Sequence, residues 1–277
     1  PFSSHSIAFN ITSLANYLKS SIFVELNKKH DILENIAIKN YLLQHNVPCI
    51  TPKAALIDMD GVLYDSMKNH VEAWYRTLTP MGFKCSKDEF YLYEGRTGAS
   101  TIKYLFDKHF GKQVSDDECA EIYKIKEKHF NALEEIVPMP GADLMLQRII
   151  DNGIRPVLVT GSGQGSLLDR LDHDYPGVFE QQYKVTAYDV KIGKPSPEPY
   201  LMGLSKAGVK ANEAIVIENA PLGVVSGTTA QIFTIAVNTG PIPAQALIEA
   251  GADMVFPSMP DFANHVDELI HTLKITR

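Results

Sequence analysis

Residues 54–62 read AALIDMDGV and form the most informative stretch of the chain. Four apolar residues, typical of a buried strand, are followed by two carboxylates one residue apart, Asp58 and Asp60. Because neighbouring side chains of a strand point to opposite faces, Asp58 and Asp60 share a face and can converge on one metal ion or phosphorus atom. Gly61 allows a sharp turn directly after them. An isolated Asp-x-Asp is as often an ordinary acidic turn, so the decision rests on the rest of the chain.

A second apolar run ends in a hydroxyl and a glycine-rich loop. Residues 156–163 read PVLVTGSG. After the predicted strand, Thr160 offers a hydroxyl, and the backbone amides around Gly161 and Ser162 can bind phosphate oxygens. Such loops are also common as simple turns, and this one lacks the patterns of the nucleotide-binding loops.

Two further segments supply a lysine and a second acid. Residues 193–199 read GKPSPEP and hold Lys194 between a glycine and a proline-rich turn. Residues 214–221 read AIVIENAP, a predicted strand that ends in Glu218 and Asn219. A single lysine is usually a solvated surface residue. The order acid, hydroxyl, lysine, acid along the chain is far more specific, and it predicts a phosphoryl-transfer site.

With these four segments in this order, the chain resembles the phosphohydrolases of the haloacid dehalogenase (HAD) superfamily. The resemblance covers roughly residues 53–258, most of the chain. It implies an α/β fold, a doubly wound (Rossmann-like) and mostly parallel sheet with an inserted helical cap domain. It also implies a Mg²⁺ cofactor and an aspartyl-phosphate intermediate.

Each polar group has an expected chemical role in such a site. Asp58 is the candidate nucleophile, because a carboxylate that attacks phosphorus forms an acyl-phosphate and divides one hard displacement into two easier ones. Asp60 would protonate the leaving oxygen and then deprotonate the attacking water. Lys194 would balance the developing negative charge, while Thr160 and the amides that follow it would hold the transferring phosphoryl group.

The same segments offer oxygen ligands to a metal ion. Mg²⁺ prefers octahedral oxygen coordination with few protein ligands, which suits Asp58, Asp60 and the pair Glu218 and Asn219. Asn219 departs from the Glu-Asp pair that most members of the superfamily carry, and the amide removes one negative charge. Glu94 is the predicted replacement, because it lies in the expected cap, just before Gly95 and Gly98, which allow a tight loop that points the acid into the cleft.

The combination of Glu94 with Asn219, together with YEGRTG (residues 93–98) and VNTG (residues 237–240), resembles a branch of HAD enzymes that are inorganic pyrophosphatases. A cap carboxylate that reaches the metal would pull the cap over the site, and the closed site would suit a compact substrate such as pyrophosphate. Arg96 in the same loop is a candidate substrate ligand. Taken alone, Glu94 is as readily a helix cap, and Arg96 a surface residue.

Other interpretations stay open. A β-phosphoglucomutase would have the same core and cap, and His70, 12 residues after Asp58, lies where such mutases carry a histidine. His70 is as readily a packing residue between cap and core, so it does not separate the two activities. A phosphatase of a small organic phosphate is the third interpretation. A non-catalytic phosphate-binding protein that docks through its N-terminal residues is disfavoured, because the nucleophile and the lysine are both present.

Apolar periodicity predicts how the chain is divided. Residues 1–50 form an N-terminal extension that is expected to be helical, and a packing or disordered extension is favoured over a partner-binding segment. Residues 66–136 contain three or four amphipathic helices without a strand and form the predicted cap, in which the run KIKEK at 124–128 is expected to be a solvated helix face. Residues 51–65 and 137–277 form the core, in which strands and helices alternate.

The composition is typical of a soluble enzyme. The 277 residues are 45% hydrophobic and 21% charged, and their net charge of −7 argues against nucleic acid as a partner. The three cysteines, Cys49, Cys85 and Cys119, form no disulfide framework and no metal-ligand spacing, so a cytoplasmic location is expected. No membrane span, secretory signal or partner protein is expected. The expected partner is a small phosphorylated substrate.

Overall fold

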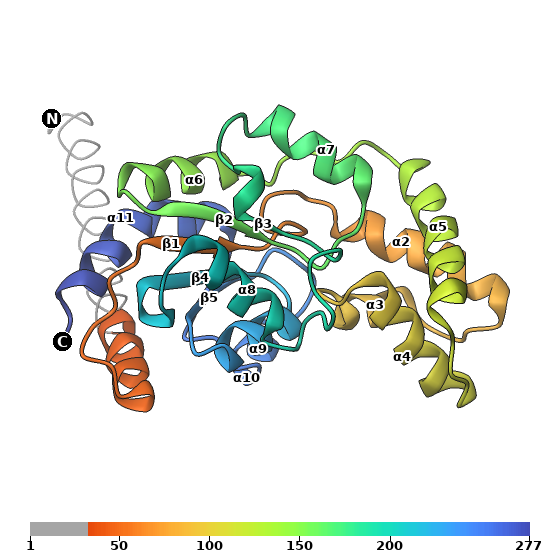
Figure 1. Cartoon of the computed structure of the whole chain (residues 1–277), viewed down its shortest axis with the longest axis horizontal. Helices are drawn as coiled ribbons and strands as arrows, with labels where there is room; N and C mark the ends of the chain where they lie inside the picture. Colours follow the sequence, from red (N-terminus) through yellow and green to blue (C-terminus); the bar gives the residue numbers. More distant parts are fainter. Residues whose placement is uncertain (1–32) are drawn as a thin grey trace, which may run out of the picture.

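The computed structural model describes residues 33–277 (Figure 1). Residues 1–32 of the predicted N-terminal extension lie outside the described part of the chain. Residues 33–45 form a helix, and its side chains Ile38, Tyr41 and Leu42 belong to the main hydrophobic core. Tyr41 also donates a hydrogen bond of 2.7 Å to the carbonyl oxygen of Gln231, so this part of the extension packs on the core.

In the described part of the chain, six parallel strands form the central sheet. They are β1 (Ala54–Ile57), β2 (Arg155–Val159), β3 (Lys184–Val185), β4 (Ala214–Glu218), β5 (Phe233–Val237) and β6 (Met254–Phe256). Their order is β3-β2-β1-β4-β5-β6. In register, Ile57 pairs with Leu158 on one side and with Ile217 on the other. The residues that follow these three strands therefore meet at one edge of the sheet.

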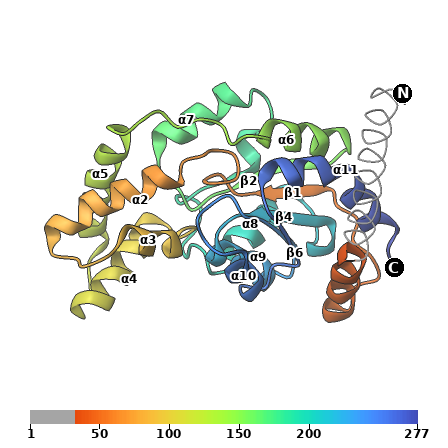
Figure 2. The same ribbon diagram turned by 180° about the vertical axis from the view of Figure 1, so that it is seen from behind.

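Helices cover both faces of the sheet, as Figures 1 and 2 show. On one face lie α6 (Ala142–Asp151), α7 (Gly165–Asp174) and α11 (Met259–Ile275); on the other lie α8 (Glu198–Ala207), α9 (Pro221–Thr229) and α10 (Ala244–Glu249). Two short 3-10 helices, η3 (Gln181–Tyr183) and η4 (Ala211–Glu213), precede β3 and β4. This is the predicted doubly wound arrangement. None of the helices in residues 33–277 has the length and apolar character that crossing a membrane requires.

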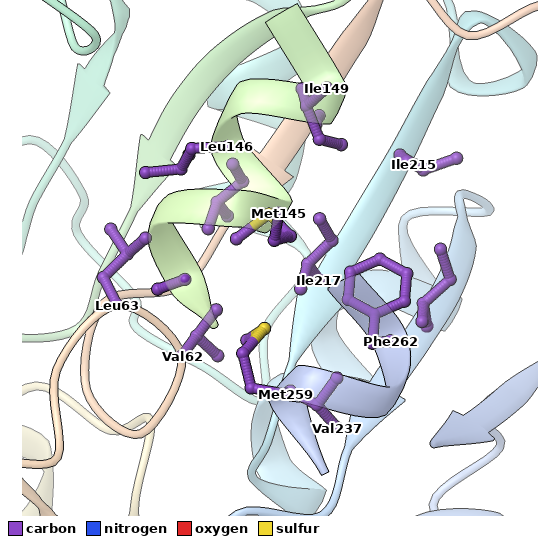
Figure 3. Close-up of a cluster of buried hydrophobic side chains, with 14 of the residues drawn as sticks. Val62, Leu63, Met145, Leu146, Ile149, Ile215, Ile217, Val237, Met259 and Phe262 are labelled. Carbon is purple, nitrogen blue, oxygen red and sulfur yellow. The ribbon is translucent and has the colours of Figure 1, made fainter. Parts of the chain in front are cut away.

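The alternation of side chains along β1 divides them between the two faces. Ala55 and Ile57 belong to the cluster formed with α6 and α11, whereas Ala54 and Leu56 pack on the face covered by α8. Figure 3 shows the larger cluster, in which Ile217 of β4 lies among side chains of α6 and α11. Every residue of β1 and β4 is buried, as expected for central parallel strands covered on both sides.

A helical layer stands at one end of the sheet (Figure 1). It consists of α2 (Met67–Leu78), η1 (Thr79–Met81), α3 (Lys87–Phe90), η2 (Tyr91–Tyr93), α4 (Gly98–Phe110) and α5 (Asp116–Asn131). These helices share a hydrophobic cluster of their own. The two segments that join this layer to the sheet pair with each other: the amide of Asp65 donates to Val137 at 3.0 Å, and that of Met139 donates to Leu63 at 2.9 Å. We propose that this layer is the predicted cap and that the paired crossing is its hinge.

Candidate active site

Lys194 connects the two acids at the ends of β1 and β4. Its Nζ donates hydrogen bonds of 2.6 Å to Oδ1 of Asp58 and 2.6 Å to Oε1 of Glu218. A third hydrogen bond, of 3.0 Å, reaches the carbonyl oxygen of Val159. Burial lowers the pKa of Lys194, but the charges of Asp58 and Glu218 raise it more, so its pKa lies above the ordinary value. Lys194 is therefore a buried cation held between two carboxylates.

Protein donors fill the hydrogen-bonding positions of Glu218. Its Oε1 accepts from Lys194 and from the hydroxyl of Tyr200 at 2.8 Å. Its Oε2 accepts from the amides of Asn219 at 2.9 Å and Ala220 at 3.2 Å. A carboxylate offers about four such positions. We therefore propose that Glu218 holds Lys194 in place; its expected contact with the metal, direct or through water, stays a prediction.

Asp60 faces the cap. Its Oδ1 accepts from Oγ of Ser66 at 2.6 Å and lies 2.8 Å from Nε2 of His70. The other ring nitrogen of His70 lies 2.7 Å from Nζ of Lys126, and an ammonium donor there leaves Nε2 as the protonated nitrogen of a neutral ring. Burial raises the pKa of Asp60, but His70 and Ser66 together lower it below its ordinary value. His70 also packs against the ring of Phe130, with 4.4 Å between centroids.

The prediction that residues 124–128 form a solvated helix face is wrong at Lys126. Lys126 is 1% exposed, and burial lowers its pKa to about 7. Its Nζ also lies 3.2 Å from Oε1 of Gln164, a residue at the start of α7. The sequence signal for its position is the four-residue spacing with Ile122 and Phe130, which puts all three on the buried stripe of α5.

Glu94 brings a further carboxylate from the cap. Within the described residues, its Oε1 is buried without a hydrogen-bond partner, and so is Oδ1 of Asn219. Burial, and then the charges of the three carboxylates of the core, raises the pKa of Glu94 well above its ordinary value. Burial also raises the pKa of Asp58, to about 8. Such a group of acids is stable only when protons or a cation compensate their charge.

The donor set fits a divalent cation that prefers oxygen. Asp58, Asp60, Glu94 and Asn219 line one cavity and offer it carboxylate and amide oxygens. A buried polar atom without a partner costs about 1–3 kcal/mol, and ligation would satisfy two of them, Oε1 of Glu94 and Oδ1 of Asn219. Mg²⁺ accepts this kind of oxygen ligand and completes its octahedron with water or phosphate oxygens. Binding of Mg²⁺ by these four residues stays a prediction, with which this geometry is consistent.

The cap is closed over this cavity. A Cβ atom on Gly161 would clash with the carbonyl oxygen of Gly95, so the backbones of the core loop and the cap loop touch. The cavity has a volume of about 60 Å³, which corresponds to roughly four to six water positions at about 10–15 Å³ each. Trp74 and Tyr123 contribute aromatic rings to its wall on the cap side.

Most of the residues that the sequence predicted to bind substrate line the same cavity. They are Thr160, Gly161, Ser162 and Arg96. The hydroxyl oxygen of Thr160 accepts from the amide of Ser162 at 3.0 Å. Arg96 stacks 4.6 Å over the ring of Tyr104, donates 3.2 Å to Ser100, and keeps a buried Nε without a partner. Lys194 was also predicted to bind substrate. It does not line the cavity, and its ammonium group instead donates a hydrogen bond to Asp58.

This arrangement is that of a capped α/β phosphohydrolase. The sequence model of the haloacid dehalogenase-like hydrolases matches residues 55–237, and the chain belongs to this family.

Three similar proteins illustrate the family. A solved structure of a candidate β-phosphoglucomutase from Bacteroides vulgatus is 50% identical, with a TM-score of 0.84, and the similarity covers 88% of this chain and 99% of that one. Hexitol phosphatase A of Escherichia coli (strain K12) is 29% identical over 223 residues, 80% of this chain and 92% of its own. A phosphorylated carbohydrates phosphatase of Thermotoga maritima is 28% identical over 206 residues, 72% of this chain and 92% of its own. None of these three proteins is named as a pyrophosphatase.

Proposed function

We propose that the chain is a Mg²⁺-dependent phosphohydrolase that works through an aspartyl-phosphate, and that its substrate is inorganic pyrophosphate. One observation carries the choice of substrate. Glu94 extends a buried carboxylate oxygen, without a partner in the described residues, from the cap to the cavity that Asp58 and Asn219 line. A cap that must close this far to complete the site leaves space for a compact substrate and little for a large leaving group.

A sugar phosphate is the second candidate, and the comparisons favour it over pyrophosphate. The curated relatives are named for hexitol and carbohydrate phosphates, and the similar solved structure is named for a phosphoglucomutase. The rings of Trp74 and Tyr123 offer apolar surface for an organic group. In that case the chain would be a sugar phosphatase or, if the phosphoryl group returned to the sugar, a β-phosphoglucomutase.

In the proposed reaction, Asp58 attacks phosphorus and the bond to the leaving oxygen breaks. Lys194 orients this carboxylate by holding its Oδ1 at 2.6 Å, which leaves Oδ2 to attack. Thr160 and the amides that follow it bind the non-bridging oxygens. Mg²⁺, when bound by the four oxygen-bearing side chains of the cavity, supplies positive charge that offsets the phosphoryl oxygens and favours ionised carboxylates.

The state of Asp60 favours a leaving group that needs no proton. Ser66 and His70 hold Asp60 as a carboxylate with a pKa below its ordinary value, so it is suited to accept a proton from the water that hydrolyses the aspartyl-phosphate. The phosphate released from pyrophosphate leaves as a stable anion, whereas a sugar oxygen must be protonated as it leaves. The base role predicted for Asp60 therefore suits this geometry better than the acid role.

Phosphate release from pyrophosphate with Mg²⁺, beside hexose and hexitol phosphates and β-glucose 1-phosphate, tests the proposal. We expect kcat/KM for pyrophosphate to exceed that for each organic phosphate by about 100-fold or more, and Asp58→Asn to abolish the activity. Rapid release from a sugar phosphate with little from pyrophosphate would retain the nucleophile and overturn the substrate. Conversion of β-glucose 1-phosphate into another sugar phosphate would identify a mutase.

A further inference from the structure

A cysteine, a glutamate and a histidine meet in the cap outside the active site. Cys85 precedes α3, Glu89 lies on α3, and His109 lies at the end of α4. One ligand atom from each residue lies within 4.8 Å of the other two, and Sγ of Cys85 is 3.3 Å from Nε2 of His109. None of the three lines the catalytic cavity, so the cluster is independent of the proposed Mg²⁺ site.

The three donors match a borderline-soft metal ion better than Mg²⁺. Thiolate and imidazole are preferred ligands of Zn²⁺, and a carboxylate is accepted beside them. With Zn–S of about 2.3 Å and Zn–N of about 2.0–2.1 Å, a tetrahedral site separates sulfur and nitrogen by about 3.6 Å. The observed 3.3 Å between Sγ of Cys85 and Nε2 of His109 is close to this separation. The carboxylate oxygen of Glu89 lies within 4.8 Å of both atoms, so it would have to move by only about 1 Å to reach a shared ion.

The surroundings hold the ligands and leave an oxygen for a metal. The ring of Phe83 packs against that of His109, with 5.4 Å between centroids. Lys108 donates a 2.7 Å hydrogen bond to Oε1 of Glu89, and the hydroxyl of Tyr93 donates to the same oxygen. Because both hydrogen bonds end on Oε1, Oε2 is the oxygen through which Glu89 would bind an ion.

We infer that Cys85, Glu89 and His109 form a Zn²⁺-type site in the cap, separate from the catalytic centre, with a fourth position open to water. The site joins the loop before α3 to α3 and α4, which lie side by side in the cap (Figure 1). The chain then continues from α3 through η2 directly to Glu94. An occupied site therefore fixes the start of the segment that carries the cap carboxylate.

Titration of the full chain with Co²⁺, a spectroscopic substitute for Zn²⁺, tests this inference. The protein is reduced and kept in excess Mg²⁺, so that oxygen-only sites are filled. We expect one equivalent to produce a thiolate-to-metal charge-transfer band in the near ultraviolet, which Zn²⁺ then abolishes. The catalytic site contains no thiol among its lining residues, so this band does not report the catalytic site, and cysteine variants (Cys49→Ser among them) identify which of the three free thiols binds the ion.

Matched variants decide the outcome. Cys85→Ser should lose the band, and Cys119→Ser, which changes the other cap cysteine, should keep it. Loss of a residue that only hydrogen-bonds to a metal ligand weakens metal binding by about 10–100-fold. His109→Gln removes a ligand itself and should weaken Co²⁺ binding by more than this. Thermal melting without metal verifies that each variant folds, and added Zn²⁺ should raise the melting temperature of the wild type and of Cys119→Ser but not of Cys85→Ser. A band that survives in folded Cys85→Ser, or its absence from the wild type, would overturn the inference.

Discussion

Replacing Glu94 by glutamine is expected to stabilise the metal-free protein and to weaken its binding of Mg²⁺. Without the ion, burial and neighbouring carboxylates raise the pKa of Glu94 well above 4.5. The folded-state pKa then lies above the unfolded value, so the folded protein retains a proton that the unfolded chain releases. The contribution of Glu94 to the free energy of unfolding is therefore fully present below pH 4.5 and is lost as the pH rises through the folded-state pKa. Glutamine, which does not titrate, removes this loss.

The size of the effect at pH 7 has a clear upper limit. A carboxyl with an unfolded pKa of 4.5 that stays protonated in the folded protein costs about 1.36 kcal/mol for each of the 2.5 pH units, or about 3.4 kcal/mol. At about 2–4 °C per kcal/mol for a chain of this size, the metal-free variant should melt up to roughly 7–14 °C above the wild type. With Mg²⁺ this gain should shrink, because the lost charge should weaken Mg²⁺ binding about tenfold or more, or about 1.4 kcal/mol.

Thermal melting in a chelator at pH 7 and at pH 4, with calorimetric Mg²⁺ titration, measures both effects. The control is Glu121→Gln, a change on a cap helix at a side chain that is 72% exposed and paired with Lys124. This control should alter stability by less than about 0.5 kcal/mol. Equal melting of metal-free wild type and Glu94→Gln at pH 7 would refute the claim that Glu94 is a repelled, buried carboxyl. Equal Mg²⁺ affinity would refute its role as a ligand.

Three further predictions concern groups around the same cavity. Lys194→Met leaves two buried carboxylates without their cation, so we expect denaturant unfolding to show a loss of about 3–5 kcal/mol and hydrolysis to fall by about 10³-fold or more. Gly161→Ala places a Cβ against the carbonyl oxygen of Gly95, which should hinder closure of the cap. We expect kcat to fall about tenfold or more while metal-free stability is retained. An unchanged kcat would contradict the closed position of the cap. Lys126 has a folded-state pKa of about 7, below its ordinary 10.5, so its contribution to the free energy of unfolding rises with pH between these values. Urea unfolding of Lys126→Met from pH 6 to pH 9 should lack this rise.

The edge of the sheet that carries the site could be predicted because its signals are local. Asp58, Thr160 and Glu218 each follow an apolar run, and the carboxyl ends of parallel strands meet at one edge. The amide at Asn219 predicted a compensating acid elsewhere, and Glu94 does line the same cavity. The chemical roles of these residues stay predictions.

The remaining contacts depend on tertiary structure that no local pattern encodes. The hydrogen bond from Tyr200 to Glu218 links residues 18 positions apart on different elements, and it occupies an oxygen of Glu218 in a way that the sequence did not predict. Lys126 belongs to a charged run, and only the packing of α5 against the rest of the molecule shows that one face of that run is buried. Cys85 and His109 are 24 positions apart, a spacing that matches no metal-binding motif.

In the proposed site, Asn219 with Glu94 would place a negative charge on the cap and not in the core, and this placement would couple cap closure to metal binding. With the cap open, Glu94 would return to water, where its pKa would approach the ordinary value; with the cap closed and no cation, it would face the other carboxylates. Closure should therefore strengthen Mg²⁺ binding, and Mg²⁺ should favour closure by the same free energy. A substrate large enough to hold the cap open would lose the contribution of Glu94, whereas a compact one would keep it. This coupling is an argument for pyrophosphate that does not depend on the volume of the cavity.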